Sequence, residues 1–245
     1  MNFLQPDSNV VIVGASGGIG SAFTRQLAEQ QRAASVLAFS RSGNAGQLAG
    51  VSSNYMDVCD EASIESAANL ARSVGPLDLV IVASGILHRG ADIAPEKSMR
   101  ALDADTLVEV MRVNAIGPAL VAKHFLPLLR RGRKTVFAAL SARVGSIGDN
   151  RLGGWASYRS SKAALNMLLR TLSIEHARKR PDSIVAALHP GTVATALSQP
   201  FTSNVPADRL FSPDESAARL LDVIDGLEPA DTGGFFAWDG SAIDY

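Results

Sequence analysis

Two residues four positions apart, Tyr158 and Lys162, form the strongest pair for proton transfer in this sequence. On a helix this spacing places both side chains on one face. A phenol with its ordinary pKa of about 10 is a poor base at neutral pH, but a nearby cation stabilises the phenolate and lowers that pKa. The pair therefore suits general acid/base chemistry at a substrate oxygen.

A glycine-rich segment near the N-terminus has the pattern of a dinucleotide-binding turn. It reads Gly14-Ala15-Ser16-Gly17-Gly18-Ile19-Gly20 and stands between an expected strand and an expected helix. Glycines let the backbone turn sharply and approach a pyrophosphate, whose charge a helix N-terminus stabilises. The segment lacks the Lys-Ser/Thr ending of a nucleoside-triphosphate loop, which excludes that class. A tight turn that uses glycine for backbone reasons alone is the alternative.

The end of the second expected strand holds the residues that would face the adenosine ribose, Ser40-Arg41-Ser42. A carboxylate here favours NAD because it accepts from the ribose hydroxyl, whereas an arginine suits the 2′-phosphate of NADP. The sequence therefore predicts NADP(H) as the cofactor, with NAD disfavoured. The alternative is that Arg41 is a solvated loop residue.

Short apolar runs alternate with longer helical patterns along the chain. Strands are expected at Val10–Val13, Ser35–Ser40, Ser53–Met56, Leu77–Val82, Thr135–Leu140, Ile184–Leu188 and near Phe235–Trp238. Helices are expected from the glycine turn to about Gln30, and over Ala104–Leu129, Trp155–Lys179 and Pro213–Gly226. This alternation predicts an α/β fold, a Rossmann-like doubly wound parallel sheet with right-handed crossovers. No linker or repeat divides residues 1–245, so we expect a single dinucleotide-binding and catalytic domain.

Three irregular stretches follow the fourth, fifth and sixth expected strands: Ile86–Asp103, Ala142–Gly154 and Ala196–Ser212. They lie at the carboxyl ends of the strands, where open α/β sheets bind ligands. We expect the first and third to determine substrate specificity, and Ala196–Ser212 to close over bound ligands. Trp155, one turn before Tyr158, is expected either to line the substrate site or to cap the helix.

Composition and charge exclude several classes of protein. The net charge of −1 gives no reason to expect nucleic acid or an anionic membrane as a partner. Cys59 is the only cysteine, which excludes an intrachain disulfide and a thiolate metal cluster. The four histidines, His88, His124, His176 and His189, lack metal-ligand spacing, and no metal is expected. With no signal peptide or membrane-spanning run visible, we expect a cytoplasmic protein.

Taken together, the motifs resemble the short-chain dehydrogenase/reductase family. Its order and spacing are matched over essentially the whole chain by Gly14-x-x-x-Gly18-x-Gly20, Asn114, Ser141, Tyr158-x-x-x-Lys162 and Pro190-Gly191. The closing segment Phe235–Gly240 and the turn Val82-Ala83-Ser84-Gly85 resemble the carbonyl-reductase branch that includes sniffer and the bacterial C-factor proteins. Two positions depart from the family: Val13 replaces a common threonine, and the turn at Val82 replaces Asn-Asn-Ala-Gly. We expect apolar packing to take the place of the lost polar links.

The resemblance implies a role for each matched residue. Tyr158 would exchange a proton with the substrate oxygen, and Lys162 would bond the nicotinamide ribose and lower the tyrosine pKa. Ser141 would orient and polarise the carbonyl, and Asn114 would hold a water that links the lysine to solvent. Beyond the glycine turn and the ribose segment, the implied cofactor contacts are Asp57, Val58, Ala83, Ser84, Gly85, Pro190, Gly191, Thr192, Val193 and Thr195.

The sequence therefore predicts a short-chain oxidoreductase that transfers a hydride between NADP(H) and a small carbonyl or alcohol substrate. By analogy with the family we expect a homodimer or homotetramer through the Ala104–Leu129 and Trp155–Lys179 helices. One alternative is a non-enzymatic NAD(P)-binding signalling protein on the same fold. Against it stand the complete catalytic side chains, since binding alone requires no proton donor. A nucleotide-sugar epimerase is disfavoured because we expect no separate C-terminal substrate domain.

Overall fold

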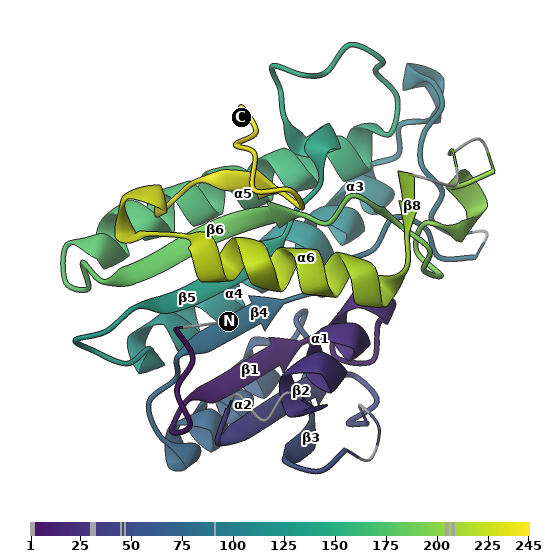
Figure 1. Ribbon diagram of the computed structural model, residues 1–245. Coiled ribbons are helices and arrows are strands. Elements are labelled where there is room, and N and C mark those ends of the chain that lie inside the picture. The colour runs from purple at the N-terminus through teal and green to yellow at the C-terminus, as the bar shows by residue number, and fades with distance from the viewer. Residues whose placement is uncertain are drawn as a thin grey trace.

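Seven parallel strands form the central sheet of the computed structural model (Figure 1). The structure describes residues 3–29, 33–44, 46, 48–90, 92–203, 206 and 209–245. The strand order is β3-β2-β1-β4-β5-β6-β9, so the chain reverses its direction of winding between β1 and β4. The strands are β1 Asn9–Val13, β2 Ser35–Ser40, β3 Val51–Tyr55, β4 Leu79–Val82, β5 Thr135–Leu140, β6 Ser183–His189 and β9 Phe235–Ala237. The predicted Rossmann-like α/β fold is confirmed.

The strands differ in burial according to their place in the sheet. Every residue of β1, β4 and β5 is buried, as expected for central parallel strands covered on both faces. The edge strand β3 has the sequence Val-Ser-Ser-Asn-Tyr, and none of its residues is buried. Its weak apolar pattern explains why the sequence placed this strand two residues too late, at Ser53–Met56.

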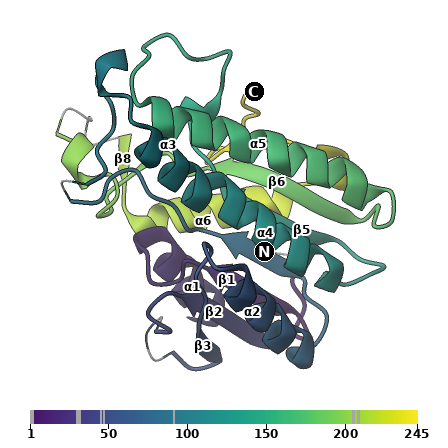
Figure 2. The ribbon, with the colours of Figure 1, turned by 180° about the vertical axis from the view of Figure 1, so that it is seen from behind.

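Helices cover both faces of the sheet. Helices α1 (Gly18–Glu29) and α6 (Pro213–Gly226) lie on one face, in front in Figure 1. Helices α2 (Glu61–Val74), α4 (Gly117–Phe125) and α5 (Ala156–Ala177) lie on the other face, in front in Figure 2. None of the described helices is long and apolar enough to cross a bilayer.

Two apolar cores result, one on each face of the sheet, because alternate strand residues point to opposite faces. In the first core Ile12 packs with Phe23 of α1 and Leu220 of α6. In the second core Val80 packs with Phe125 of α4 and Leu165 of α5. The doubly covered sheet holds the strand ends, and the loops that follow them, in fixed positions.

The helix expected without interruption over Ala104–Leu129 is broken into parts. Helix α3 spans Ala104–Met111, a π-helical turn follows at Arg112–Ile116, and α4 runs on from Gly117 to Phe125 before a 3₁₀ turn at Leu126–Leu128. Such single π turns inside helices are rare and often occur at functional sites. Here the widened turn contains Asn114, one of the expected site residues.

The loops after β4, β5 and β6 meet at the carboxyl end of the sheet, at the right in Figure 1. The last of them contains short structure that the sequence did not predict. Strand β7 (Thr192–Val193) pairs in parallel with strand β8 (Leu210–Phe211). A 3₁₀ turn spans Gln199–Phe201. The expected closing segment Ala196–Ser212 includes residues 204, 205, 207 and 208, which lie outside the described residues.

Close packing at Gly20 generates a first prediction. A Cβ atom at this helical position would overlap the carbonyl oxygen of Gly14, which itself has φ +83°. We expect Gly20→Ala to destabilise the protein by about 1–3 kcal/mol, as overpacking usually does. The matched control is Gly226→Ala, in helix α6, where nothing lies within 4 Å of the added carbon. Urea unfolding should show the loss at position 20 alone; equal stability of both variants would contradict the assigned packing.

Candidate active site

A cleft of about 670 Å³ opens where β1, β2, β3 and β4 end. It lies beside the β1/β4 reversal, where doubly wound folds bind dinucleotides. Many of the predicted cofactor contacts line it: Gly14, Ser16, Gly17, Ser40, Arg41, Asp57, Val58, Ala83, Ser84 and Gly85. The predicted cofactor contacts that are not among its lining residues are Gly18, Ile19, Gly20, Ser42 and the segment Pro190–Thr195. The expected catalytic residues Asn114, Ser141, Tyr158 and Lys162 do not line it either.

The glycine turn packs tightly against its neighbours. A Cβ atom at Gly14 would lie 2.7 Å from the backbone nitrogen of Ser84, and one at Gly18 would lie 2.7 Å from Cγ2 of Thr195. The turn after β1 therefore touches both the turn after β4 and the segment after β6. Because Gly18 begins helix α1, the unpaired amides of that helix end are available to an anion in this place.

The segment Pro190–Thr195 runs from the end of β6 past the start of α1. The Pro190 carbonyl accepts a hydrogen bond of 2.9 Å from Ser216 Oγ, and Val193 lies in β7. Gly191 has φ +79°, and a Cβ atom there would lie 2.7 Å from the Phe211 ring. The segment is thus fixed against α6 and β8, with Thr195 facing the glycine turn.

The two departures from the family pattern pack against each other. Val13 and Val82 are partners in the β1–β4 register, and both are 1% exposed within the same apolar core. Apolar packing does replace a polar link here. The turn after β4 also contains Ser84, whose buried Oγ has no hydrogen-bond partner within the described residues.

These features fit a bound dinucleotide. The unpartnered Ser84 hydroxyl lies in the cleft lining, and the close approaches at Gly14 and Gly18 form a cradle that any larger side chain would fill. Arg41 is exposed on the cleft wall and forms no ion pair within the described part of the chain. Its neighbours are already engaged, because Ser40 Oγ and Ser42 Oγ lie 3.0 Å apart and both donate to the Asn44 carbonyl.

Lys162 lies buried between the ends of β4 and β5. Its Nζ donates a 2.8 Å hydrogen bond to the Leu140 carbonyl and lies 5.8 Å from the centre of the Tyr158 ring. A Cβ atom at Gly85 would lie 3.6 Å from the same Nζ. The structure therefore brings Tyr158 and Lys162 of α5 to the turn after β4 that also lines the cleft.

Burial controls the protonation of this pair. It lowers the pKa of Lys162 to about 8 and raises the pKa of Tyr158 to about 12. The expected lowering of the tyrosine pKa is therefore not seen in this structure, where desolvation of the phenolate shifts that pKa in the opposite direction. The phenol keeps its proton at neutral pH.

Asn114 ties the turn after β4 to helix α5. Its Oδ1 accepts from the Ile86 backbone nitrogen at 2.7 Å, and its Nδ2 donates to the Ile86 carbonyl at 2.8 Å and to Ser161 Oγ at 3.1 Å. Both N–H groups of the fully buried amide are therefore bonded to protein groups, and Oδ1 accepts one hydrogen bond. This bonding fixes the backbone next to Gly85, and it depends on the π-helical turn that carries Asn114.

Ser141 directly follows β5 and is 3% exposed. Its backbone nitrogen donates to the Leu188 carbonyl of β6, and its Oγ donates a 2.7 Å hydrogen bond to Asn166 Oδ1. Tyr158, Lys162 and Asn166 are spaced by four residues along α5, so they share one helix face. Asn166 was not predicted as a site residue, although its four-residue spacing from Lys162 is visible in the sequence.

Aromatic rings lie beside Tyr158. The Trp155 ring centre is 6.4 Å from that of Tyr158 and 5.1 Å from that of Phe201, and the His88 ring lies 5.8 Å from Phe201. His88 Nε2 also lies 3.0 Å from the Ala196 carbonyl, which links the loops after β4 and β6. Trp155 also occupies the position before α5, with a left-handed φ of 54° and no capping hydrogen bond from its side chain. Its place in the substrate site stays a prediction.

A buried carboxylate, Glu96, holds the start of α5. Its side chain accepts hydrogen bonds from the Ser157 backbone nitrogen and from Ser157 Oγ, and its carbonyl accepts from the Trp155 nitrogen at 2.6 Å. A negative charge is stabilised at a helix N-terminus. Glu96 lies 61 residues before Ser157 in the chain. No local pattern could have identified this contact.

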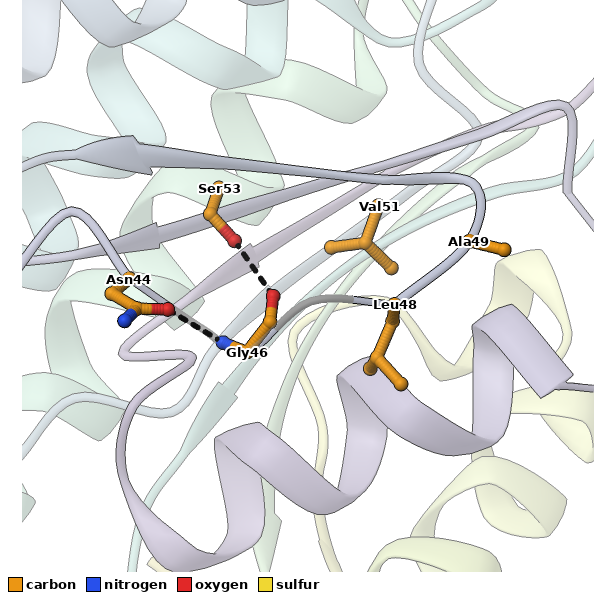
Figure 3. Close-up of a pocket in the computed structure, with 6 residues that line it drawn as sticks. All are labelled: Asn44, Gly46, Leu48, Ala49, Val51 and Ser53. Atoms are coloured by element: carbon orange, nitrogen blue, oxygen red, sulfur yellow. Dashed lines mark hydrogen bonds between the residues drawn. The ribbon is translucent and has the colours of Figure 1, made fainter.

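A second hollow lies away from these groups, beside the edge strand β3 (Figure 3). It is lined by Asn44, Gly46, Leu48, Ala49, Val51 and Ser53. The Gly46 nitrogen donates to Asn44 Oδ1, and Ser53 Oγ donates to the Gly46 carbonyl. These contacts shape a surface turn, and none of the expected catalytic residues lines it.

Comparison with known proteins gives consistent results. A family model described as short chain dehydrogenase matches residues 8–206. The 1-hydroxy-2-glutathionyl-2-methyl-3-butene dehydrogenase of Rhodococcus sp. (strain AD45) is 34% identical over 242 residues, covering 97% of this chain and 100% of that protein. C-signal of Myxococcus xanthus is 35% identical over 170 residues, covering 69% and 93% respectively. The NADPH-bound carbonyl reductase from chicken fatty liver superposes with a TM-score of 0.82 at 28% identity, covering 98% of this chain and 95% of that one.

The role of Glu96 can be tested by its removal. We expect Glu96→Ala to cost about 1–3 kcal/mol of stability, because the Ser157 donors then lose their buried partner. Glu96→Gln keeps one acceptor oxygen and should lose less. The control is Glu109→Ala, which removes a partly exposed ion pair with Arg89 and should cost about 1 kcal/mol or less. If urea unfolding showed that Glu109→Ala and Glu96→Ala lose equal free energies of unfolding, the capping role of Glu96 would be refuted.

Proposed function

The chain belongs to the short-chain dehydrogenase family, as its motifs predicted, and is an oxidoreductase; from this membership we propose that it transfers a hydride between NADP(H) and a carbonyl or alcohol, with Tyr158 as the proton donor and acceptor. One observation carries the proposal. Lys162 Nζ bonds the Leu140 carbonyl beside Ser141 and lies close to Gly85 of the cleft. The proton-transfer groups thus adjoin the cleft at Gly85, one of its lining residues.

The proposed cofactor contacts come from the residues that line the cleft and from the segments beside it. The Gly14–Gly20 turn and the N-terminus of α1 would hold the pyrophosphate, and Arg41 would meet the 2′-phosphate. Asp57 and Val58 would face the adenine, while Ser84 and the Pro190–Thr195 segment would complete the site. When bound, the nicotinamide dinucleotide supplies or accepts the hydride. The similar chicken carbonyl reductase was solved with NADPH, which supports the choice of NADP.

Tyr158 supplies the proton that a carbonyl oxygen needs when it is reduced. Because burial raises the pKa of Tyr158 to about 12, the phenol holds that proton at neutral pH. As the proton leaves, the Lys162 ammonium group stabilises the phenolate that remains. Oxidation of an alcohol begins instead from the phenolate, which burial disfavours.

The aromatic rings beside Tyr158 indicate what the substrate carries. Trp155 and Phe201 pack edge to face and, with His88, border the region next to the phenol. Such a wall favours an apolar group beside the reacting carbonyl. Ser141, at the end of β5, would orient the carbonyl oxygen.

Assembly with further copies is part of the proposal. Val108 of α3 is 67% exposed, and Met167 and Ile174 of α5 are 66% and 49% exposed. Exposed apolar side chains on neighbouring helices support a homodimer or homotetramer through these faces.

A non-enzymatic dinucleotide-binding protein remains the second candidate, because the relative from Myxococcus xanthus bears the name C-signal. This second candidate predicts that the protein binds NADPH but reduces no carbonyl compound. The side chains Ser141 and Tyr158 favour the enzyme, because binding alone requires neither a proton donor nor a group that polarises a carbonyl.

The role of Tyr158 as proton donor can be tested by removing its hydroxyl oxygen. Tyr158→Phe should lower turnover of NADPH with a reactive ketone by roughly 10²–10⁴-fold, the usual contribution of general acid catalysis. The fold and the affinity for NADPH should persist. Tyr55→Phe, at the exposed end of β3, is the control and should keep full activity. If Tyr158→Phe retained most of its turnover, another group would have to be the acid.

Cofactor choice can be tested at Arg41. An arginine that meets a phosphate with charge-assisted hydrogen bonds contributes about 1.5–3 kcal/mol, which corresponds to roughly a 10- to 150-fold preference for NADPH over NADH. Arg41→Ala should weaken NADPH by most of that factor and leave NADH unchanged. Arg72→Ala, on the exposed part of α2, is the control. Dissociation constants from calorimetry decide; equal affinities for both cofactors in the unmutated protein would show that Arg41 is a solvated loop residue.

A further inference from the structure

We propose that Asn166 is a positioning residue that sets the direction of the Ser141 hydroxyl proton; this inference rests on the reaction proposed above. Asn166 is 1% exposed, and its Oδ1 accepts a 2.7 Å hydrogen bond from Ser141 Oγ. It lies one turn beyond Lys162 on the same face of α5. Nothing else in the described residues bonds the Ser141 hydroxyl.

The chemistry of the serine determines what its partner must do. A hydroxyl group carries one proton and can accept two further hydrogen bonds. To polarise a carbonyl, Ser141 must give that proton to the substrate oxygen, and its protein partner must then donate. Asn166 meets both needs, because a half-turn of its amide exchanges Oδ1 for Nδ2, two groups of nearly equal size. Nδ2 then donates to Ser141 Oγ and directs the hydroxyl proton toward the cleft.

The amide nitrogen of Asn166 forms no hydrogen bond of its own within the described residues. Asn166 Nδ2 is buried and has no hydrogen-bond partner within the described residues, and the same holds for Nδ1 of His189. An amide held by the fold in one orientation would have both ends paired. The unpaired end leaves Asn166 free to turn between the two orientations.

The sheet register places His189 on the side of Asn166. The Ser141 nitrogen bonds the Leu188 carbonyl, and the preceding partners Ala139 and Ala187 belong to the core beneath α5. Because side chains alternate along a strand, Ser141 and His189 both face α5. Burial lowers the pKa of His189 to about 4, so its ring is neutral and carries one N–H. Neither Nδ1 of His189 nor Nδ2 of Asn166 has a hydrogen-bond partner within the described residues, so the two atoms do not bond each other and the ring does not fix the orientation of the amide.

The substitutions Asn166→Asp and Asn166→Leu separate this role from simple packing. A carboxylate at position 166 accepts from Ser141 but has nothing to donate, so it holds the hydroxyl proton away from the substrate. A leucine of similar volume leaves the hydroxyl without any partner. We therefore expect Asn166→Asp to harm turnover more than Asn166→Leu, although Asp is closer to Asn in chemistry.

A double-mutant cycle in turnover with NADPH and a ketone is the test. Ser141→Ala and Asn166→Asp should each lower kcat on the order of 10²-fold, the loss typical of a removed transition-state donor. The double variant should be no slower than Ser141→Ala alone, with the Kd for NADPH unchanged throughout. Ser173→Ala, another buried polar position on α5, is the control and should leave kcat unchanged.

The outcomes distinguish the inference from the function beneath it. An Asn166→Asp loss of equal size with and without Ser141 would overturn the inference, since Asn166 would then act independently of the serine. If Asn166→Asp does not fold, Asn166→Leu in the same cycle decides by the same criterion. A fully active Ser141→Ala variant, or an unmutated protein that reduces no carbonyl, would overturn the proposed function, and the inference would fail with it.

Discussion

The hydrogen bond from Lys162 Nζ to the Leu140 carbonyl joins helix α5 to the carboxyl end of β5, and the arrangement of the site depends on it. A buried ammonium group is costly without such a partner. The bond acts together with the apolar contacts of Leu165 and Leu169, which pack α5 on the sheet. With α5 fixed, Tyr158 and Asn166 fall one turn to either side of Lys162, and Ser141 follows directly after the carbonyl that the lysine binds.

Two further polar contacts hold the turn after β4 and its loop against the same helix. Asn114 joins Ile86 to Ser161 within the helix, and Glu96 binds Ser157 at the helix start. The cleft wall at Gly85 and the first turn of α5 are thereby positioned as one unit. An oriented set of groups of this kind needs little rearrangement when charge develops on a substrate oxygen, which is how such sites lower a barrier.

The sequence predicted the central strands well because β1, β4 and β5 are apolar runs buried on both faces. It predicted β3 less well, since an edge strand of Val-Ser-Ser-Asn-Tyr has little apolar signal. The π-helical turn at Asn114 and the cap from Glu96 depend on contacts between distant segments, which no local pattern encodes. The raised pKa of Tyr158 was missed for a similar reason: spacing shows the nearby cation, but only the fold shows the burial.

We propose above that this chain reduces carbonyl groups with NADPH. The most direct measurement uses NADPH deuterated at the transferring carbon of the nicotinamide, a panel of aldehydes and apolar ketones, and mass spectrometry of the products. We expect one deuterium on the carbinol carbon of at least one product. The Tyr158→Phe variant should form this labelled alcohol much more slowly. Tight binding of NADPH with no labelled alcohol from any member of the panel would contradict it and favour the non-enzymatic candidate.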